Sequence, residues 1–453
     1  MKRPRFGRLR IPDRLTQGWR ARLRAQRRWW RTRLKREDGA VLFPVAGQGM
    51  VAVHTLQEAA ADAVDAPRIA ILHATAGSGH KSAAQALASA VAAACPGAVV
   101  REVDTLVFAS RLYRTTYAAS YNAMAARAPR LWGALYRSWA MAPVNKGTAP
   151  VRLALDRLNL RRLVRVAERE APDAIVCTHF LPIEALSPRR GQGRLPVPLF
   201  CVITDFAAHP FWVFPHVDRY FVASEDVADE LAGHGVARQR IEVTGIPVDP
   251  RFAHPIGRDT ARARLGIEND RPVVLVMGGG SGVGPLADLA ERLAGLASRP
   301  TVLVVCGINQ TLRRKIEALA AATGNATNPA AIRALGFTRE VDTLMEACDV
   351  LVGKAGGLTC SEALIKGTPL VVFKPTPGQE VRNADYLQRH QVARHADTVE
   401  EVEATVEAWL ANPADLGRRR EAALAIAHPH AAETIARRVL EAVRNRSTRP
   451  TGA

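Results

Sequence analysis

The sequence has no apolar run long enough to cross a membrane. No uninterrupted apolar stretch in its 453 residues approaches the roughly 20 residues that a spanning helix requires. The basic N-terminus is not followed by the apolar segment of a secretory signal peptide. We therefore expect a folded body that stays in the cytosol, with any membrane contact peripheral.

The sequence also lacks the cysteine spacings of metal and redox sites. Its six cysteines form no Cys-x-x-Cys pair and have no histidines at zinc-finger distance. Several lie in apolar segments, so we expect buried free thiols in a reducing compartment and no metal site. They are Cys95, Cys177, Cys201, Cys306, Cys348 and Cys360.

Three nucleotide-site motifs are missing as well. Residues 76–82 resemble a Walker A loop, but His80 interrupts its Gly-Lys-Ser run, and the preceding glycine is misplaced. Neither glycine-rich turn matches the dinucleotide fingerprint Gly-x-Gly-x-x-Gly, and no Asp-x-Asp pair occurs. These absences argue against a P-loop and a nicotinamide cofactor. They also predict that a bound diphosphate is held by backbone amides rather than by a cation.

Positive charge is abundant and unevenly placed. The net charge is +19, and residues 1–36 hold 15 Lys or Arg against a single acid, Asp13, so they carry +14 of it. The basic character therefore belongs to an arm, residues 1–38, while the remaining body is nearly balanced. Such an arm attracts an acidic surface, either anionic lipid or nucleic acid.

The apolar residues of this arm are spaced as on a helix. Trp19 and Trp30 recur with leucines at intervals of mostly four, among many arginines. This pattern is typical of a helix in the plane of a membrane interface. The alternatives are a disordered solubilising tail and a nucleic-acid-binding arm, and the balanced body argues against the latter. Residues 39–66 mix Gly with Ala and indicate a linker, in which Met50 is an alternative start of the chain.

Residues 67–250 indicate a first α/β domain. An apolar strand at 68–75, a glycine turn and a helix at 81–94 form a βα unit whose turn faces a ligand. His80 lies at the helix N-terminus, where the dipole disfavours a protonated imidazole. A neutral imidazole suits a general base that removes a proton from an alcohol. The alternative is a histidine that only caps or packs the helix.

Further apolar segments alternate with helical stretches, which predicts a parallel sheet with ligands at the carboxyl ends of its strands. Four polar residues lie at such ends and are candidate site residues: Thr178, His179, Asp205 and His209. The segments are 98–104, 173–180, 198–205, 219–225 and 241–248.

Residues 106–145 carry many aromatic side chains among arginines, including Trp132 and Trp139. Such a region can line an apolar groove and touch a membrane surface. A helical pair that packs on the sheet is the equally open alternative.

Residues 251–428 repeat the α/β layout. Gly279, Gly280 and Ser281 follow an apolar strand, and their amides and hydroxyl suit a diphosphate. Glu362 lies one helical turn beyond another glycine-rich turn, where it could bind both ribose hydroxyls or simply stabilise the helix dipole. A polar cluster after the last strand could read sugar hydroxyls and comprises Gln379, Glu380 and Asn383.

Taken together, these segments resemble glycosyltransferase family 28, above all the monogalactosyldiacylglycerol synthases and the bacterial processive diacylglycerol glucosyltransferases. The resemblance covers roughly residues 68–400. It implies the GT-B fold: two Rossmann-like α/β domains face a cleft, with the lipid acceptor on the first and the UDP-sugar on the second. Residues 429–453 would form a helix that crosses back to the first domain, and a tail. The segments include HATAGSGHKSAAQAL, CTHFLP, VITDFAAHPFW, VMGGGSGVG, KAGGLTCSEAL and KPTPGQEVRNADYL.

The resemblance also implies roles for single residues. Thr75 stands where the galactosyl members carry an acid, so the loop is similar to the glucosyl type. The catalytic residues implied are His80, Asp205 and His209. The acceptor or membrane residues are Gly77, Gly79, Thr178, His179 and Trp212, with Trp132, Trp139, Trp19 and Trp30. The donor residues are Gly279, Gly280, Ser281, Phe337 (on uracil), Lys354, Gly356, Gly357, Thr359, Glu362, Gln379, Glu380 and Asn383.

The implied reaction is an inverting single displacement at the cytoplasmic face of the cell membrane. His80 or a nearby carboxylate takes the proton of a diacylglycerol hydroxyl, and UDP departs. The expected partners are a UDP-sugar, diacylglycerol or a related lipid, and an anionic membrane, with no nucleic acid, cofactor or obligatory metal. The alternatives are N-acetylglucosamine transfer to another lipid and a UDP-sugar 2-epimerase of the same fold.

Overall fold

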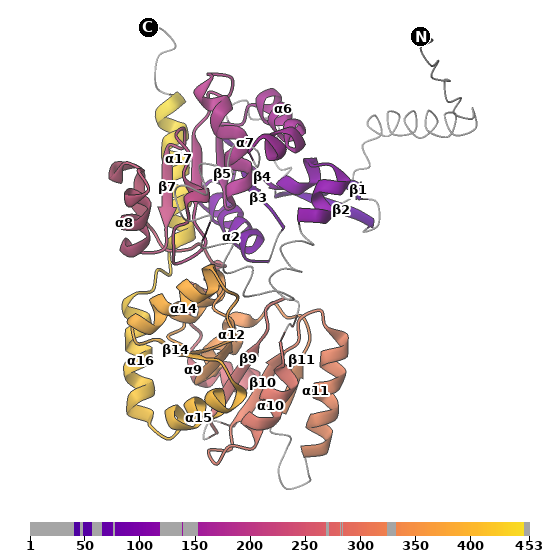
Figure 1. The fold of residues 1–453 in the computed structure, drawn as a ribbon, viewed down its shortest axis with the longest axis vertical. Helices are drawn as coiled ribbons and strands as arrows, with labels where there is room; N and C mark the ends of the chain where they lie inside the picture. The colour runs from indigo at the N-terminus through magenta and orange to yellow at the C-terminus, as the bar shows by residue number, and fades with distance from the viewer. Residues whose placement is uncertain are drawn as a thin grey trace, which may run out of the picture.

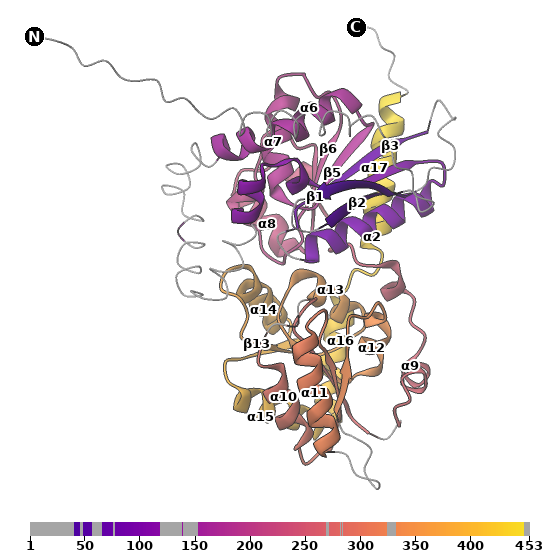
Figure 2. The ribbon, with the colours of Figure 1, turned by 90° about the vertical axis from the view of Figure 1, so that its right-hand side faces the viewer.

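The protein is described by a computed structural model, in which two α/β domains lie one above the other (Figures 1 and 2). This confirms the predicted fold class. The described residues are 40–45, 49–56, 66–75, 78–117, 138, 153–268, 271–280, 282, 284–323 and 332–447.

The first domain is built on an eight-stranded sheet of order β1-β2-β4-β3-β5-β6-β7-β8. Pairing is parallel from β4 to β8, as the alternation of apolar and helical segments predicted. Its strands are β1 (Ala40–Val45), β2 (Gly49–Leu56), β3 (Arg68–His73), β4 (Val99–Asp104), β5 (Ala174–Cys177), β6 (Leu199–Val202), β7 (Arg219–Val222) and β8 (Ile241–Val243). The helices are α2 (Ser78–Ala94), α6 (Arg161–Glu170), α7 (Phe180–Gly191) and α8 (Glu225–Gly233), with short 3-10 turns that include η1 (Thr105–Phe108), η2 (Pro210–Trp212), η3 (Arg238–Arg240) and η4 (Pro250–Ala253).

The segment predicted as a linker, 39–66, differs in part from that prediction. Strands β1 and β2 form an antiparallel hairpin, and β2 pairs antiparallel with β4, which extends the sheet. The β-branched residues Val51, Val53 and Thr55 alternate along β2, a pattern that favours a strand. The Gly and Ala content of the segment concealed this alternation.

The second domain has a six-stranded parallel sheet of order β11-β10-β9-β12-β13-β14. Its strands are β9 (Val273–Met277), β10 (Thr301–Val305), β11 (Ile332–Leu335), β12 (Val350–Gly353), β13 (Leu370–Phe373) and β14 (Ala393–Ala396). Its helices are α9 (Arg258–Arg264), α10 (Leu286–Ala294), α11 (Gln310–Thr323), α12 (Val341–Ala347), α13 (Gly357–Ile365), α14 (Gln379–Arg389), α15 (Val399–Leu410) and α16 (Pro413–Ala425).

The last helix, α17 (Ala431–Ser447), follows the second domain in sequence but packs on the first (Figure 1). Ile435 and Val439 are buried with Ile69 and Leu87, which belong to β3 and α2. This apolar contact ties the end of the chain to the first domain. It is the helix predicted near residues 429–453.

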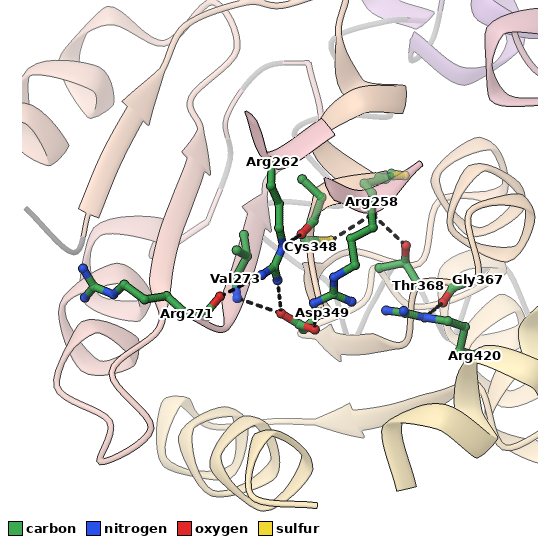
Figure 3. A network of polar contacts seen from close by, with 11 residues as sticks. Arg258, Arg262, Arg271, Val273, Cys348, Asp349, Gly367, Thr368 and Arg420 are labelled. Carbon is green, nitrogen blue, oxygen red and sulfur yellow. Dashed lines mark hydrogen bonds and ion pairs between the residues drawn. The ribbon is translucent and has the colours of Figure 1, made fainter. Parts of the chain in front are cut away.

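A buried charge network lies at one end of the second sheet, beside the amino end of β12. The guanidinium groups of Arg258 and Arg262 converge on Asp349, and Arg420 lies beside them (Figure 3). Asp349 also accepts the Val273 N–H at 2.9 Å, so one carboxylate joins α9, β9 and β12. The Arg262 side chain is only 3% exposed, so it depends on this carboxylate for charge compensation. The network lies at the end of the strands opposite to the ligand edge.

All six cysteines are free, and five of them are buried, as predicted. No helix among the described residues combines the length and apolarity of a membrane span.

Candidate active site

The carboxyl ends of the two sheets face each other across the boundary between the domains, where α2, α13 and α14 meet (Figure 2). A Cβ placed on Gly79 would lie 3.5 Å from Leu358 of α13, and one on Gly280 would lie 4.0 Å from Ser78 of α2. The glycine turn of the first domain therefore lies against the turns of the second. This is the arrangement that a reaction between groups bound on separate domains requires.

His80 is held by two segments of its own domain. Its Nδ1 lies 2.8 Å from the Thr178 carbonyl oxygen, while the Thr178 hydroxyl donates to the His80 carbonyl at 2.8 Å. A carbonyl oxygen only accepts, so Nδ1 carries the hydrogen, and the lone pair is on Nε2. The ring is therefore oriented with its basic nitrogen away from the protein backbone that fixes it.

The pKa of His80 falls from 6.5 to about 4. Burial is the largest cause, the Thr178 hydrogen bond opposes it, and His73 adds a smaller lowering. The sequence predicted a neutral imidazole from the helix dipole. The direction agrees, but desolvation is the dominant reason.

An aromatic wall surrounds this imidazole. The His179 ring meets it edge-on at 4.6 Å, and Trp212, which is 5% exposed, lies 6.4 Å from both histidine rings. Phe180 and Tyr117 contact His179 in turn. Thr178, His179 and Trp212 are thus brought together with His80. The wall offers an apolar approach to a base, as a lipid alcohol would need.

Thr204 is a site residue that the sequence analysis missed. Its hydroxyl lies 2.9 Å from Nδ1 of His80, so two threonines share the orientation of the ring. Thr204 is the second residue after the end of β6 and precedes Asp205. Its position near the carboxyl end of a strand indicated a site residue, but Asp205 beside it was chosen as the candidate instead.

Asp205 lies at the contact between the domains. Its Oδ1 accepts a hydrogen bond from Asn383 of α14 at 3.1 Å. Burial raises its pKa from 3.8 to about 6, against the opposing Asn383 bond and with a further rise from Glu380.

Asn383, predicted to read the sugar, is fully buried and bonded within the protein. Its Nδ2 also donates to the Ala355 carbonyl at 2.9 Å, and its Oδ1 accepts from the Phe206 N–H at 2.7 Å. Both amide hydrogens are therefore used by protein atoms, and the side chain joins the two domains instead. Because the side chain is 0% exposed, a sugar could contact it only after the contact between the domains rearranged.

His209, predicted as catalytic, has a clear structural use. Its Nδ1 accepts from the Phe211 N–H at 3.2 Å and caps η2, the turn that carries Trp212. The ring packs on Phe211 at 4.2 Å and is 3% exposed. This geometry positions Trp212, and the catalytic role stays a prediction.

The glycine loop after β9 has the conformation that glycine permits. Gly279 and Gly282 have φ of +70° and +57°. A Cβ on Gly282 would meet the Cys306 carbonyl oxygen at 2.2 Å, so a side chain is excluded there. Backbone amides in such a glycine-rich turn can approach a phosphate closely.

Phe337 follows β11 and is 67% exposed. Ile308 follows the neighbouring strand β10 and is 68% exposed. Two large apolar side chains at adjacent strand ends are a fitting platform for a flat base. Phe337 was predicted to contact uracil, and this role stays a prediction.

The start of α13 carries the predicted ribose and phosphate residues. Gly356 caps the helix, and Thr359 is partly buried in its first turn. Lys354 Nζ lies 3.4 Å from the Thr376 hydroxyl. Burial, with Asp249 and Asp342 nearby, raises the pKa of Glu362 from 4.5 to about 8. A carboxyl with a pKa this high is largely protonated at neutral pH, so it can donate as well as accept.

Gln379 and Glu380 form the first turn of α14 and are both partly buried. Glu380 Oε2 accepts from the Thr376 N–H at 2.5 Å. This bond ties the turn after β13 to the helix, and through Thr376 to Lys354. The remaining predicted site residues lie outside the described residues: Gly77, Ser281, Trp19, Trp30, Trp132 and Trp139.

Comparison with known proteins places each domain. Residues 80–248 match the monogalactosyldiacylglycerol (MGDG) synthase family, and residues 257–425 match glycosyl transferases group 1. The processive diacylglycerol beta-glucosyltransferase of Bacillus pumilus is 32% identical over 54% of this chain and 63% of that enzyme. The enzyme of the same name from Bacillus thuringiensis is 32% identical over 62% of this chain and 71% of that enzyme.

Solved structures support the fold alone, because their sequence identities are low. Acinetobacter baumannii MurG gives a TM-score of 0.54 at 16% identity, over 83% of this chain and 99% of that one. Staphylococcus aureus MnaA with UDP gives 0.53 at 11% identity, over 86% and 100%. The match in sequence is therefore what decides the family. The chain belongs to glycosyltransferase family 28, among the monogalactosyldiacylglycerol synthases and processive diacylglycerol glucosyltransferases.

Proposed function

We propose that this protein transfers a hexose from a UDP-sugar to diacylglycerol at a membrane surface, with inversion at the anomeric carbon. The observation that carries the proposal is His80. Its Nδ1 is bound to the Thr178 carbonyl, so a neutral Nε2 is free to accept a proton, and the donor-side turns lie directly opposite. The activity of the diacylglycerol glucosyltransferase relatives supports the choice of donor and acceptor.

In this mechanism Nε2 of His80 takes the proton of the glycerol hydroxyl, and the oxygen attacks the anomeric carbon as the bond to UDP breaks. The backbone around Gly279 and Gly280, together with Lys354, receives the negative charge of the departing diphosphate. Because these are amides and an ammonium group, we propose that no metal ion is obligatory. Phe337 and Glu362 hold the uridine.

The acceptor side has a surface suited to an anionic membrane. Leu112, Leu155 and Leu158 are 74%, 53% and 51% exposed. They belong to two helical segments, 111–117 and 153–159, that are joined by a hydrogen bond from the Tyr113 hydroxyl to Asp156. Exposed arginines flank them: Arg111, Arg157, Arg161, Arg162 and Arg165.

Apolar side chains within a basic rim favour insertion into an anionic interface, with each arginine worth about 1 kcal/mol. The inner side of the same helices reaches the site. Tyr113 stacks on Tyr117 at 5.5 Å, and Tyr117 contacts the His179 ring at 6.5 Å. A lipid that enters by this surface would therefore arrive beside His80. This placement on the cytoplasmic leaflet is part of the proposal.

The proposal is tested by incubating the full chain with diacylglycerol in phosphatidylglycerol vesicles, a panel of UDP-hexoses, and EDTA. We expect mass spectrometry to find a glycosyl-diacylglycerol with one of the sugars. Release of free sugar or of a 2-epimer, without glycolipid, would contradict lipid transfer. Product that appears only when Mg²⁺ replaces EDTA would contradict metal independence.

The surface is tested separately by vesicle sedimentation. The triple variant Leu112→Ser, Leu155→Ser and Leu158→Ser should bind anionic vesicles several-fold more weakly, because about 25 cal/mol per Å² of apolar burial is lost. Leu424→Ser is the matched control, since Leu424 is 52% exposed on the second domain. Equal binding by both variants would remove this surface from the account.

A further inference from the structure

Helix α14 contacts the first domain along most of its length. Asn383 bonds to Asp205 and to the Phe206 backbone. Tyr386 stacks on Phe206 with ring centroids 4.8 Å apart. A helix of the donor domain is thus fastened to segment 205–209 of the acceptor domain.

The most specific of these contacts involves Arg382. Its guanidinium donates to the Ala208 carbonyl at 3.0 Å and forms an ion pair with Glu230 of α8. The second oxygen of Glu230 accepts from the Ala208 N–H at 2.8 Å. Both backbone polar groups of Ala208 are therefore held by one charged pair that spans the domains.

Segment 205–209 connects two residues that contact or face His80. Thr204 precedes the segment and lies 2.9 Å from the imidazole. Trp212 follows it, in the turn capped by His209. A shift of Ala208 would therefore change the environment of the base from both ends.

The other end of α14 belongs to the donor side. Its first turn carries Gln379 and Glu380, and Arg382 lies on the next residues of the same rigid helix. Movement of this turn when a sugar binds would be transmitted to Ala208 without an intervening hinge.

We propose that Arg382 is a positioning residue, which together with Glu230 sets the acceptor segment 205–209 according to the position of the donor helix. The inference rests on the proposed transferase function. The side chains of Arg382 and Glu230 are 39% and 35% exposed, at the edge of the contact. They act through Ala208 and touch no reacting atom.

The test compares Arg382→Gln with Arg389→Gln. Arg389 also joins α14 to the first domain, through Asp226 at 2.6 Å, but it is not bonded to segment 205–209. We expect Arg382→Gln to lower kcat for the lipid roughly ten- to a hundredfold through misplacement of the acceptor side. The affinity for UDP should stay within about twofold, and Arg389→Gln should lose less than about twofold in kcat.

Two further variants separate positioning from general stability. The double variant Arg382→Gln and Glu230→Gln should lose little more kcat than either single variant, because each change breaks the same ion pair. Arg382→Lys should recover only part of the rate, since an ammonium group cannot hold Glu230 and the carbonyl with a planar fork. Equal losses of kcat in Arg382→Gln and Arg389→Gln, each with a similar fall in Tm, would show that the contact only stabilises the domain interface.

Amide hydrogen exchange reads the same contact without turnover. The Ala208 amide should exchange faster in Arg382→Gln and at the wild-type rate in Arg389→Gln. If the wild type makes no glycolipid, the proposed function fails, while the exchange rates still decide whether Arg382 holds the segment. Unchanged exchange at Ala208 would overturn the inference.

Discussion

At the scale of single residues, the proposed base His80 is oriented by neutral groups. Two threonines contact Nδ1 of His80, and the neighbours on the aromatic wall are His179 and Trp212. Without a carboxylate on Nδ1, burial dominates, and the imidazole stays neutral well below the usual histidine range. If His80 is the base, it is in the accepting form at neutral pH, at the expense of basicity.

This assignment predicts the acid limb of the pH–rate profile. If His80 is the base, kcat/KM should remain level through 6.5 and fall toward its pKa of about 4, since protonation then removes the acceptor. Asp205, with a pKa of about 6, is the competing group. A limb near 6, together with a loss of activity in Asp205→Asn, would transfer the role of base to Asp205.

The raised pKa of Asp205 also predicts how the free energy of unfolding depends on pH. Its folded pKa of about 6 lies above the ordinary 3.8, so the ionised form opposes folding, and stability rises as pH falls through 6. Asp205→Asn keeps an acceptor for Asn383 without the charge. Its free energy of unfolding in urea should exceed that of the wild type by roughly 1–3 kcal/mol near neutral pH.

The gain should shrink as the pH falls from about 6 and vanish below 3.8, where the wild-type carboxyl is protonated in both states. A destabilised Asp205→Asn at neutral pH would show that the carboxylate is compensated by a contact beyond Asn383.

At the scale of elements, the start of α13 is shaped for close approach. A Cβ on Gly357 would lie 1.9 Å from the Thr204 carbonyl oxygen and 3.3 Å from the Asp205 Cα. The helix can therefore meet the acceptor segment only with glycine at this position. A Cβ on the neighbouring Gly356, the N-cap of the same helix, would meet nothing within 4 Å.

Gly357→Ala should therefore push the domains apart, while Gly356→Ala should not. We expect a larger radius of gyration by small-angle X-ray scattering for Gly357→Ala, and a loss of about tenfold or more in kcat/KM from misalignment. Scattering curves that coincide for the two variants would indicate that the domains are not held at this contact.

The elements were largely predictable from sequence, because Val- and Ile-rich segments and alanine-rich helices have strong local preferences. Residues at strand ends, such as Thr178 and His179, were found for the same reason. Asn383 and Arg382 were not assigned to the domain contact, since their partners lie 152 to 178 positions away in the sequence. The hairpin at β1 and β2 was missed because glycine and alanine masked a period of two.

At the scale of the whole molecule, two separate helix contacts join the two domains. Helix α17 returns to the first domain through an apolar contact, while α14 meets it through polar bonds around Ala208 and Asp205. Tyr386 adds an aromatic stack on Phe206 to the contact of α14. These contacts matter for the proposed reaction, because His80 and the glycine turn after β9 belong to different domains.

The most direct test of the central claim, that His80 is the base, is the rate of glycosyl-diacylglycerol formation by His80→Asn, measured with the affinity for UDP on the same preparation. Removal of the base should lower kcat by about 10²–10⁴-fold while the affinity for UDP changes less than about twofold, since the donor turns are untouched. A His80→Asn variant that keeps the wild-type rate would contradict the account and place the base elsewhere.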